Sequence, residues 1–178
     1  MPAIEPTTPR VRIVHLDPAT ITALAEADLD AANRTAPVRL TPFLVDPGRL
    51  FTWRFRRDQV AEDPTVAAWV TGVIWADDVG QVVGQAGYHG PPDRDGMVEV
   101  GYAVDPTFRR RGYARAALQA LVDRATREPD VRTVRASVSP DNAASLAVIA
   151  PFGFVRVEEQ WDEEDGLELV YEVSAGSA

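Results

Sequence analysis

The 178-residue sequence contains no cysteine, no lysine and only two histidines. Without cysteine there are no disulfides, thiolate metal sites or cysteine nucleophiles. Without lysine there is no Walker-type phosphate loop, lysine Schiff base or lysine general base. Two histidines are too few for the usual imidazole-rich ligand sets, so we expect no metal site. All 18 basic residues are therefore arginine.

The chain also lacks positive net charge and long apolar runs. Its formal net charge of -9 argues against nucleic acid as a partner. No apolar run approaches the roughly 20 residues that a membrane helix needs, so we expect no membrane span. The opening residues MPAIEPTTPR lack the apolar core of a secretory signal. We therefore expect a cytoplasmic protein.

What remains is ordinary for a globular protein, with 46% hydrophobic and 25% charged residues. The length suits one domain with a real core. We find no internal repeat and no linker, so we expect a single domain over residues 1–178. The proline- and threonine-rich residues 1–9 are expected to be frayed.

Hydrophobic periodicity predicts the order of helices and strands. This order predicts an α/β (α+β) fold, in which helices flank a mixed, mostly antiparallel sheet. The unit over 97–138 should supply one parallel strand pair through a right-handed crossover. The helix at 17–34 begins with Asp17 as cap and Pro18 at its first position. The predicted strands are 11–16, 65–77, 81–90, 97–104, 131–138, 153–159 and 167–173, and the other helices are 49–59 (short), 112–126 and 141–150.

The stretch VDPTFRRRGYARAAL, residues 104–118, places three consecutive arginines before a glycine and a predicted helix. The first backbone N–H groups of that helix, at about 110–114, have no partners within the helix. Together with the positive helix end they suit an anion, and a diphosphate above all. Gly112 lets the backbone approach such a ligand, and Ala114 keeps the next approach small.

This stretch resembles a signature of the GNAT superfamily of N-acetyltransferases. RRRGYA at 109–114 fits Arg/Gln-x-x-Gly-x-Gly/Ala, the turn that in this family holds the pyrophosphate of acetyl-coenzyme A. VEVGYAVDP at 98–106 resembles the family's fourth strand, and SPDNAASLAVIAPFGF at 139–154 resembles its second signature. The strand and the turn are most similar to the ribosomal-protein-acetylating branch. The resemblance implies that acetyl-CoA is held by Val104 (through its backbone), Arg109, Arg110, Arg111, Gly112, Tyr113, Ala114 and Asn142.

The reaction that the resemblance implies is direct transfer of an acetyl group from acetyl-CoA to a primary amine. The acceptor is expected to be a small molecule or a peptide N-terminus. Glu99 is the first candidate for the base, because its strand runs along the acetyl group in the family. His89, at the end of the preceding strand, is the second. The alternatives are that Glu99 is the polar side of a strand and that His89 is an ordinary loop residue.

One position departs from the family pattern. Many members place a tyrosine seven residues after the asparagine, as general acid for the thiolate, and here that position is Ile149. A thiolate of pKa about 8.5 can leave unaided, or Ser139, Ser145 or a water serves instead. A further alternative is a catalytically degenerate protein that binds coenzyme A as a sensor or interaction partner.

Two stretches of charged residues do not decide whether the acceptor is cationic or anionic. EEQWDEED at 158–165 carries six carboxylates, which either attract a cationic amine or form a solvated hairpin tip. RLFTWRFRRD at 49–58 either walls a pocket with its aromatic residues or packs them beneath a helix, and its arginines would suit an anionic acceptor. Family members are often dimers, so a homodimer formed through the C-terminal strands is also expected.

Overall fold

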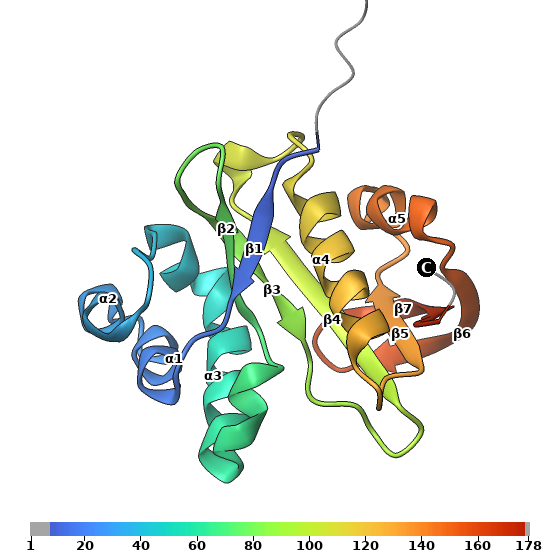
Figure 1. Cartoon of the computed structure of the whole chain (residues 1–178), viewed down its shortest axis with the longest axis horizontal. Coiled ribbons are helices and arrows are strands. Elements are labelled where there is room, and N and C mark those ends of the chain that lie inside the picture. Colours follow the sequence, from blue (N-terminus) through green and yellow to red (C-terminus); the bar gives the residue numbers. More distant parts are fainter. Residues whose placement is uncertain (1–7, 177–178) are drawn as a thin grey trace, which may run out of the picture.

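A seven-stranded sheet forms the centre of the molecule, which a computed structural model describes over residues 8–176 (Figure 1). The strand order is β1-β2-β3-β4-β5-β7-β6, and all neighbouring strands are antiparallel except β4 and β5. This confirms the predicted mixed sheet and its parallel pair. Most of the segment expected to be frayed lies outside the described residues. The strands are β1 (Val11–Val14), β2 (Gly72–Ala76), β3 (Gln81–Tyr88), β4 (Met97–Val104), β5 (Thr133–Val138), β6 (Val155–Asp162) and β7 (Gly166–Ser174).

Helices cover both faces of the sheet. One apolar cluster joins α1, α2 and α3 to one face, and a second joins α4 and α5 to the other (Figure 1). Short 3-10 turns connect several of these elements. The helices are α1 (Pro18–Ala25), α2 (Leu29–Thr35), α3 (Pro47–Glu62), α4 (Tyr113–Arg127) and α5 (Ala143–Ile149), and the turns are η1 (Pro42–Val45), η2 (Pro64–Ala68), η3 (Pro106–Phe108) and η4 (Ala150–Phe152).

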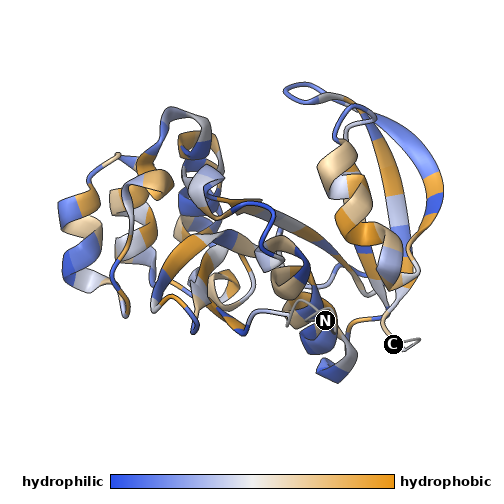
Figure 2. Ribbon diagram, turned by 90° about the horizontal axis from the view of Figure 1, so that it is seen from above, coloured by the Kyte–Doolittle hydropathy of each residue, from blue (hydrophilic) through white to orange (hydrophobic). Residues whose placement is uncertain are grey.

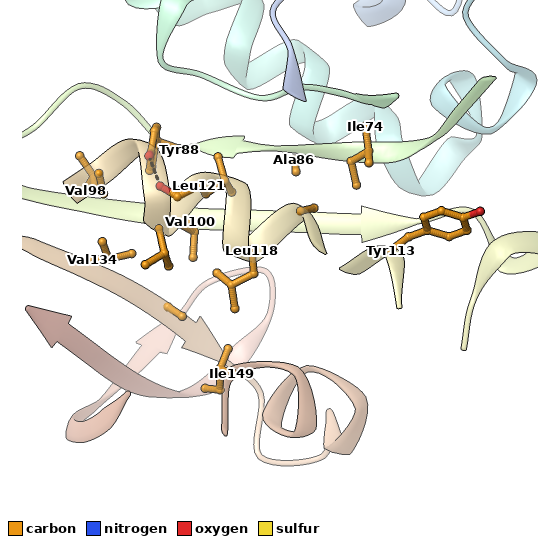
Figure 3. Packing of buried hydrophobic residues seen from close by; sticks show 14 of the residues in the cluster. Ile74, Ala86, Tyr88, Val98, Val100, Tyr113, Leu118, Leu121, Val134 and Ile149 are labelled. Atoms are coloured by element: carbon orange, nitrogen blue, oxygen red, sulfur yellow. Dashed lines mark hydrogen bonds between the residues drawn. The ribbon is translucent and has the colours of Figure 1, made fainter. Parts of the chain in front are cut away.

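Helix α4 packs on the sheet through the apolar stripe that its sequence predicts. All five stripe residues are at most 4% exposed. The Tyr88 hydroxyl donates a hydrogen bond to the Leu121 carbonyl oxygen at 2.6 Å and so ties β3 to the middle of α4 (Figure 3). The helix is thereby fixed over β4, with its N-terminus beyond the strand's end. The stripe residues are Ala117, Leu118, Leu121, Val122 and Ala125.

The single helix predicted over 17–34 is two helices. Asp17 caps α1 as expected, since its carboxylate accepts a hydrogen bond from the Thr20 N–H at 2.7 Å. The backbone then turns at Ala27, whose φ of 60° lies in the left-handed region. Asp28 starts α2 by accepting from the Ala31 N–H at 2.8 Å. A second capping aspartate therefore restarts the helix where one periodic run was expected.

Two other boundaries differ from the predictions. The strand expected over 65–77 begins only at Gly72, because Pro64 starts the turn η2 and the Asp63 carboxylate accepts from the Thr65 N–H. The short helix expected over 49–59 is the 16-residue helix α3, which Pro47 begins. These prolines set the boundaries because proline favours the first helical position.

The parallel pair separates after three residue pairs, and this separation positions the site. The last paired residues are Glu99 on β4 and Arg135 on β5. Beyond them β4 stays paired with β3 as far as Val104, while β5 stays paired with β7 as far as Val138. Figure 2 shows the resulting divergence between the half of the sheet under α1–α3 and the β6–β7 half. One edge of β4 from residue 100 onward is therefore free of a neighbouring strand.

Candidate active site

The arginine turn lies between β4 and the N-terminus of α4, as the sequence predicts. Arg110 has a φ of 61° and Gly112 a φ of 87°. A positive φ is unusual for arginine and costs free energy, so it marks a constrained turn. The first hydrogen bond of α4 runs from the Ala116 N–H to the Gly112 carbonyl oxygen at 2.9 Å. The N–H groups before it are therefore free for an anion.

The three arginines of the turn have different surroundings. Arg109 donates through Nε to the Val104 carbonyl oxygen at 3.1 Å, so it fastens the turn to the end of β4. Arg110 and Arg111 are exposed, and within residues 8–176 neither has a carboxylate within 4.0 Å. Their charges are available to an anionic ligand.

A fourth arginine approaches the turn from α3. Burial, followed by repulsion from Arg109, lowers the pKa of Arg49, and Asp46 partly offsets this. The sequence placed Arg49 in an aromatic and basic stretch without linking it to the turn. Helix α3 therefore adds positive charge at the end of β4.

The remaining residues of the turn contribute backbone rather than side chains. The Tyr113 side chain is buried (Figure 3). Its hydroxyl donates to Asp78, on the turn between β2 and β3, at 2.7 Å. Ala114 packs on the core beneath α4. A β-carbon at Gly112 would stand 3.1 Å from Pro9 Cδ. Only the N–H groups of these three residues are therefore placed to meet a ligand.

Asn142 caps helix α5. Its side-chain oxygen accepts a hydrogen bond from the Ser145 N–H at 3.0 Å. The amide nitrogen of the same exposed side chain has no hydrogen-bond partner within residues 8–176. Asn142 lies beyond the end of the diverging strand β5. Its side-chain oxygen caps α5, and its side-chain amide nitrogen remains free to donate.

The two candidate bases are brought together. His89 Nδ1 lies 3.8 Å from Glu99 Oε1, and the His89 N–H donates to the Glu99 carbonyl oxygen at 2.8 Å. His89 Nε2 lies over Gly101, 2.8 Å from where a β-carbon would stand. The imidazole thus covers β4 just after the point at which it leaves β5.

Burial favours the neutral form of His89. Burial lowers the pKa of His89 below its ordinary value of 6.5, Glu99 raises it, and the Arg56 guanidinium lowers it further. The side chain is nevertheless 47% exposed. Its ring is therefore desolvated on the side of Arg56 and Glu99 while remaining open to a reactant. A neutral imidazole at an accessible position is suited to accept a proton.

A buried arginine holds the His89 backbone, a contact that no sequence pattern predicts. Arg56 is 5% exposed and donates to the Thr71 hydroxyl at 3.0 Å, to Gln59 Oε1 at 2.8 Å and to the His89 carbonyl oxygen at 3.2 Å. Gln59 donates to the same carbonyl oxygen at 2.8 Å. Burial lowers the pKa of Arg56 to about 10, and Glu99 partly offsets this.

Ile149, where a tyrosine was considered, lies in the core and is 2% exposed (Figure 3). Tyr102 on β4 is a tyrosine that no motif of the sequence marks. Its hydroxyl is buried and has no hydrogen-bond partner within residues 8–176. Burial raises the pKa of Tyr102, and Ser145 on α5 partly offsets the rise although no hydrogen bond within 3.5 Å joins the two hydroxyls.

The aromatic residues of α3 divide between core and surface. Trp53 is fully buried and donates from its indole nitrogen to the Leu44 carbonyl oxygen at 2.8 Å. Phe51 and Phe55 are about half exposed, with ring centroids 6.3 Å apart. One of the three aromatic side chains therefore packs beneath the helix, and two remain on its surface.

The acidic stretch divides in a similar way. Asp162 organises the β6–β7 hairpin tip by accepting from the Glu164 and Asp165 N–H groups. Glu158 instead lies on β6, 3.6 Å from Arg135. On β7, burial raises the pKa of Glu168, and the nearby Asp162 and Glu99 carboxylates raise it further, against a hydrogen bond from Gln160. The Glu99 carboxylate on β4 thus acts on the pKa of Glu168 on β7, across the point where the strands diverge.

Within residues 8–176 we find no helix long and apolar enough to cross a membrane. The same residues contain no group of three acidic or histidine side chains that would hold a metal ion.

Known proteins resemble this chain in sequence or in fold. N-acetyltransferase YjdG of Bacillus subtilis, itself uncharacterized, is 34% identical over 47% of this chain and 49% of its own length. L-2,4-diaminobutyric acid acetyltransferase of Nocardia farcinica is 32% identical over 70% of this chain and 68% of its own. The match to the first of these therefore spans about half of that relative. RimL, a ribosomal L7/L12 alpha-N-protein acetyltransferase solved with coenzyme A, superposes with a TM-score of 0.65 at 18% identity, covering 98% of this chain and 99% of its own.

The family profile described as "Acetyltransferase (GNAT) domain" matches residues 10–155. That range contains the arginine turn, His89, Glu99 and Asn142. The chain therefore belongs to the GNAT family of acetyltransferases.

Proposed function

We propose that the protein transfers the acetyl group of acetyl-CoA directly to a primary amine. The observation that carries the proposal is the placement of the His89–Glu99 pair where β4 leaves β5, on the strand whose other end carries the arginine turn. The proposed anion site and the proposed proton acceptor would thus lie at the two ends of one free strand edge. A coenzyme with a diphosphate at one end and a thioester at the other matches this arrangement.

The described residues fit the coenzyme. The left-handed Arg110 and Gly112 hold the backbone so that the free N–H groups of α4 can meet a diphosphate. The exposed Arg110 and Arg111 add charge. The free edge of β4 would offer backbone groups to the pantetheine amides, with the Val104 carbonyl oxygen shared with Arg109. Asn142, at the start of α5, would offer its amide nitrogen to the coenzyme.

The His89–Glu99 pair would supply the base. An alkyl amine of pKa about 10.4 is only about one part in 10³ neutral at pH 7, so transfer benefits from a group that takes its proton. His89 Nε2 lies on the acceptor face of β4, over Gly101. Glu99 behind Nδ1 stabilises the imidazolium that forms. Glu99 is then the orienting partner, and His89 accepts the proton.

The acceptor would be an amine of a small molecule or of a peptide N-terminus. The names of the relatives are consistent with both, since one acts on a diamino acid and one on a protein N-terminus. Glu158 and Glu168 border the divergence from the opposite side and would favour a cationic amine over an anionic acceptor.

A second candidate is a coenzyme-binding sensor without turnover. Ile149 supports it, because the family's usual proton donor is replaced by a core residue. The two functions differ in one measurable respect. The sensor binds acetyl-CoA and releases no free thiol when amines are added.

Both candidate functions require that the protein bind acetyl-CoA, and calorimetric titration measures this binding. The charge-reversed variant Arg110→Glu/Arg111→Glu should bind at least about 10-fold more weakly, since two charge-assisted contacts become repulsive. Arg34→Glu/Arg94→Glu is the matched control, because both residues are exposed and far from the turn in the sequence. Absence of binding to the unaltered protein would contradict both functions. An amine screen that follows free thiol then separates the enzyme from the sensor.

A further inference from the structure

Among the described residues 8–176, the buried Tyr102 hydroxyl has no hydrogen-bond partner. Two other tyrosines of the same core are satisfied: Tyr88 donates to the Leu121 carbonyl oxygen at 2.6 Å, and Tyr113 donates to Asp78 at 2.7 Å. A buried hydroxyl left unpaired destabilises the fold, whereas phenylalanine would fill the same space without this cost. The Tyr102 hydroxyl therefore needs a hydrogen-bond acceptor from a molecule outside the chain.

Tyr102 occupies the free edge of β4, directly after Gly101. The two residues point to opposite faces of the sheet: His89 lies over Gly101 on the α3 side, and Tyr102 packs against the cluster on the α4 side. Glu99 on β4 pairs with Arg135 on β5. Three residues further along, Tyr102 on β4 is level with Val138, the last residue of β5. The hydroxyl thus lies on the opposite side of the strand edge from the proposed base.

We propose that the Tyr102 hydroxyl donates a hydrogen bond to the departing sulfur of coenzyme A. The inference rests on the proposed acetyl transfer. The amine nitrogen bonds to the acetyl carbon from the α3 side and gives its proton to His89. The carbon–sulfur bond breaks, its electron pair stays on sulfur, and the thiolate forms on the side of Tyr102. Solvent supplies the proton of the released thiol.

The surroundings of Tyr102 suit a donor that keeps its proton. Burial raises the pKa of Tyr102 above its ordinary 10, with Ser145 partly offsetting the rise, so the hydroxyl is protonated at neutral pH. Tyr102 therefore takes the role that Ile149 cannot.

The absence of cysteine makes a direct test possible, because the thiolate absorbance of the complex then belongs to coenzyme A alone. We would titrate the thiol of bound coenzyme A by ultraviolet absorbance in the unaltered protein and in Tyr102→Phe. A charge-assisted hydrogen bond should lower the pKa of the bound thiol by about one to two units, and the variant should lose this shift. Its acetyl transfer should slow by about 10- to 100-fold at saturating acetyl-CoA.

Tyr88→Phe is the matched control, because it removes a hydroxyl that is bonded inside the core. It should lower the thermal midpoint and leave the thiol titration unchanged, whereas Tyr102→Phe should keep or raise the midpoint. Equal thiol titrations in the unaltered protein and Tyr102→Phe, with coenzyme bound and acetyl transfer intact, would overturn the role of Tyr102 alone. If the unaltered protein does not bind coenzyme A, the proposed function fails and this inference fails with it.

Discussion

His89 Nε2 lies 2.8 Å from the point where a β-carbon on residue 101 would stand, so the imidazole occupies space that only Gly101 leaves open. Real β-carbon contacts are not this short. The glycine matters here for close approach and not for a left-handed backbone, since Gly101 is not among the residues with positive φ. The position of His89 over β4 therefore depends on a residue that carries no chemistry.

Gly101→Ala should displace the His89 ring while leaving the arginine turn intact. We expect a loss of about 10²-fold in kcat, similar to removal of a general base, with affinity for acetyl-CoA changed less than about 3-fold. Gly48→Ala is the control, because nothing lies within 4 Å of its added carbon. Steady-state kinetics with calorimetry would measure both values. Unchanged kcat in Gly101→Ala would contradict the placement of the base.

Burial chiefly lowers the pKa of His89, and Glu99 and then Arg56 adjust it, so substitutions of these two residues should move the acidic limb of the pH–rate profile. Activity requires neutral His89 and is lost as pH falls through the His89 pKa, which lies below 6.5. Arg56→Met removes a cation that lowers this pKa, so the limb should move to higher pH. Glu99→Gln removes a carboxylate that raises it, so the limb should move to lower pH. The groups acting on His89 are thus Arg56 on α3 and Glu99 on β4, and Glu99 in turn faces Arg135 and Glu168.

Arg56→Lys is the matched variant, since it keeps the charge and loses the planar fork that donates to Thr71, Gln59 and the His89 carbonyl oxygen. It should keep the position of the acidic limb and lower kcat by about 10-fold, because the His89 backbone is held less firmly. An equal shift of the limb in the lysine and methionine variants would refute an electrostatic role.

Much of this site follows from local sequence patterns. The arginine turn and the Asn142 cap depend on residues close in the chain, and the parallel pair follows from the strand–helix–strand order, so the sequence predicts all three. The clamp of Arg56 on His89 joins residues 33 positions apart, on elements that meet only in the folded sheet. Periodicity marks Arg56 as one more charge in a basic helix. The unpartnered state of Tyr102 is likewise invisible, because it depends on what its neighbours across the strand divergence do not offer.

Arg124 joins α4 to the other elements and should matter for stability. It donates to the Ala68 carbonyl oxygen at 2.7 Å and to Glu128 at 3.1 Å, and its guanidinium lies 4.4 Å from the centre of the Trp69 ring. Arg124→Ala should lower the free energy of unfolding by about 1–3 kcal/mol, because these groups lose their partner. Urea unfolding would measure the loss. Arg127→Ala, an exposed residue of the same helix, should change it by no more than about 0.5 kcal/mol.

Strand β6 should form the contact of a homodimer. It is an edge strand of the sheet, and it exposes apolar side chains: Val155 is 66% exposed, Val157 51% and Trp161 76%. An unpaired edge with such residues favours pairing with a second copy, because backbone donors and apolar area are then both covered. We expect sedimentation equilibrium to give a dimer, and Val155→Lys/Val157→Lys to give a monomer that still binds acetyl-CoA. Val79→Lys, on the turn between β2 and β3, should remain dimeric, so a monomer in that variant too would place the contact elsewhere.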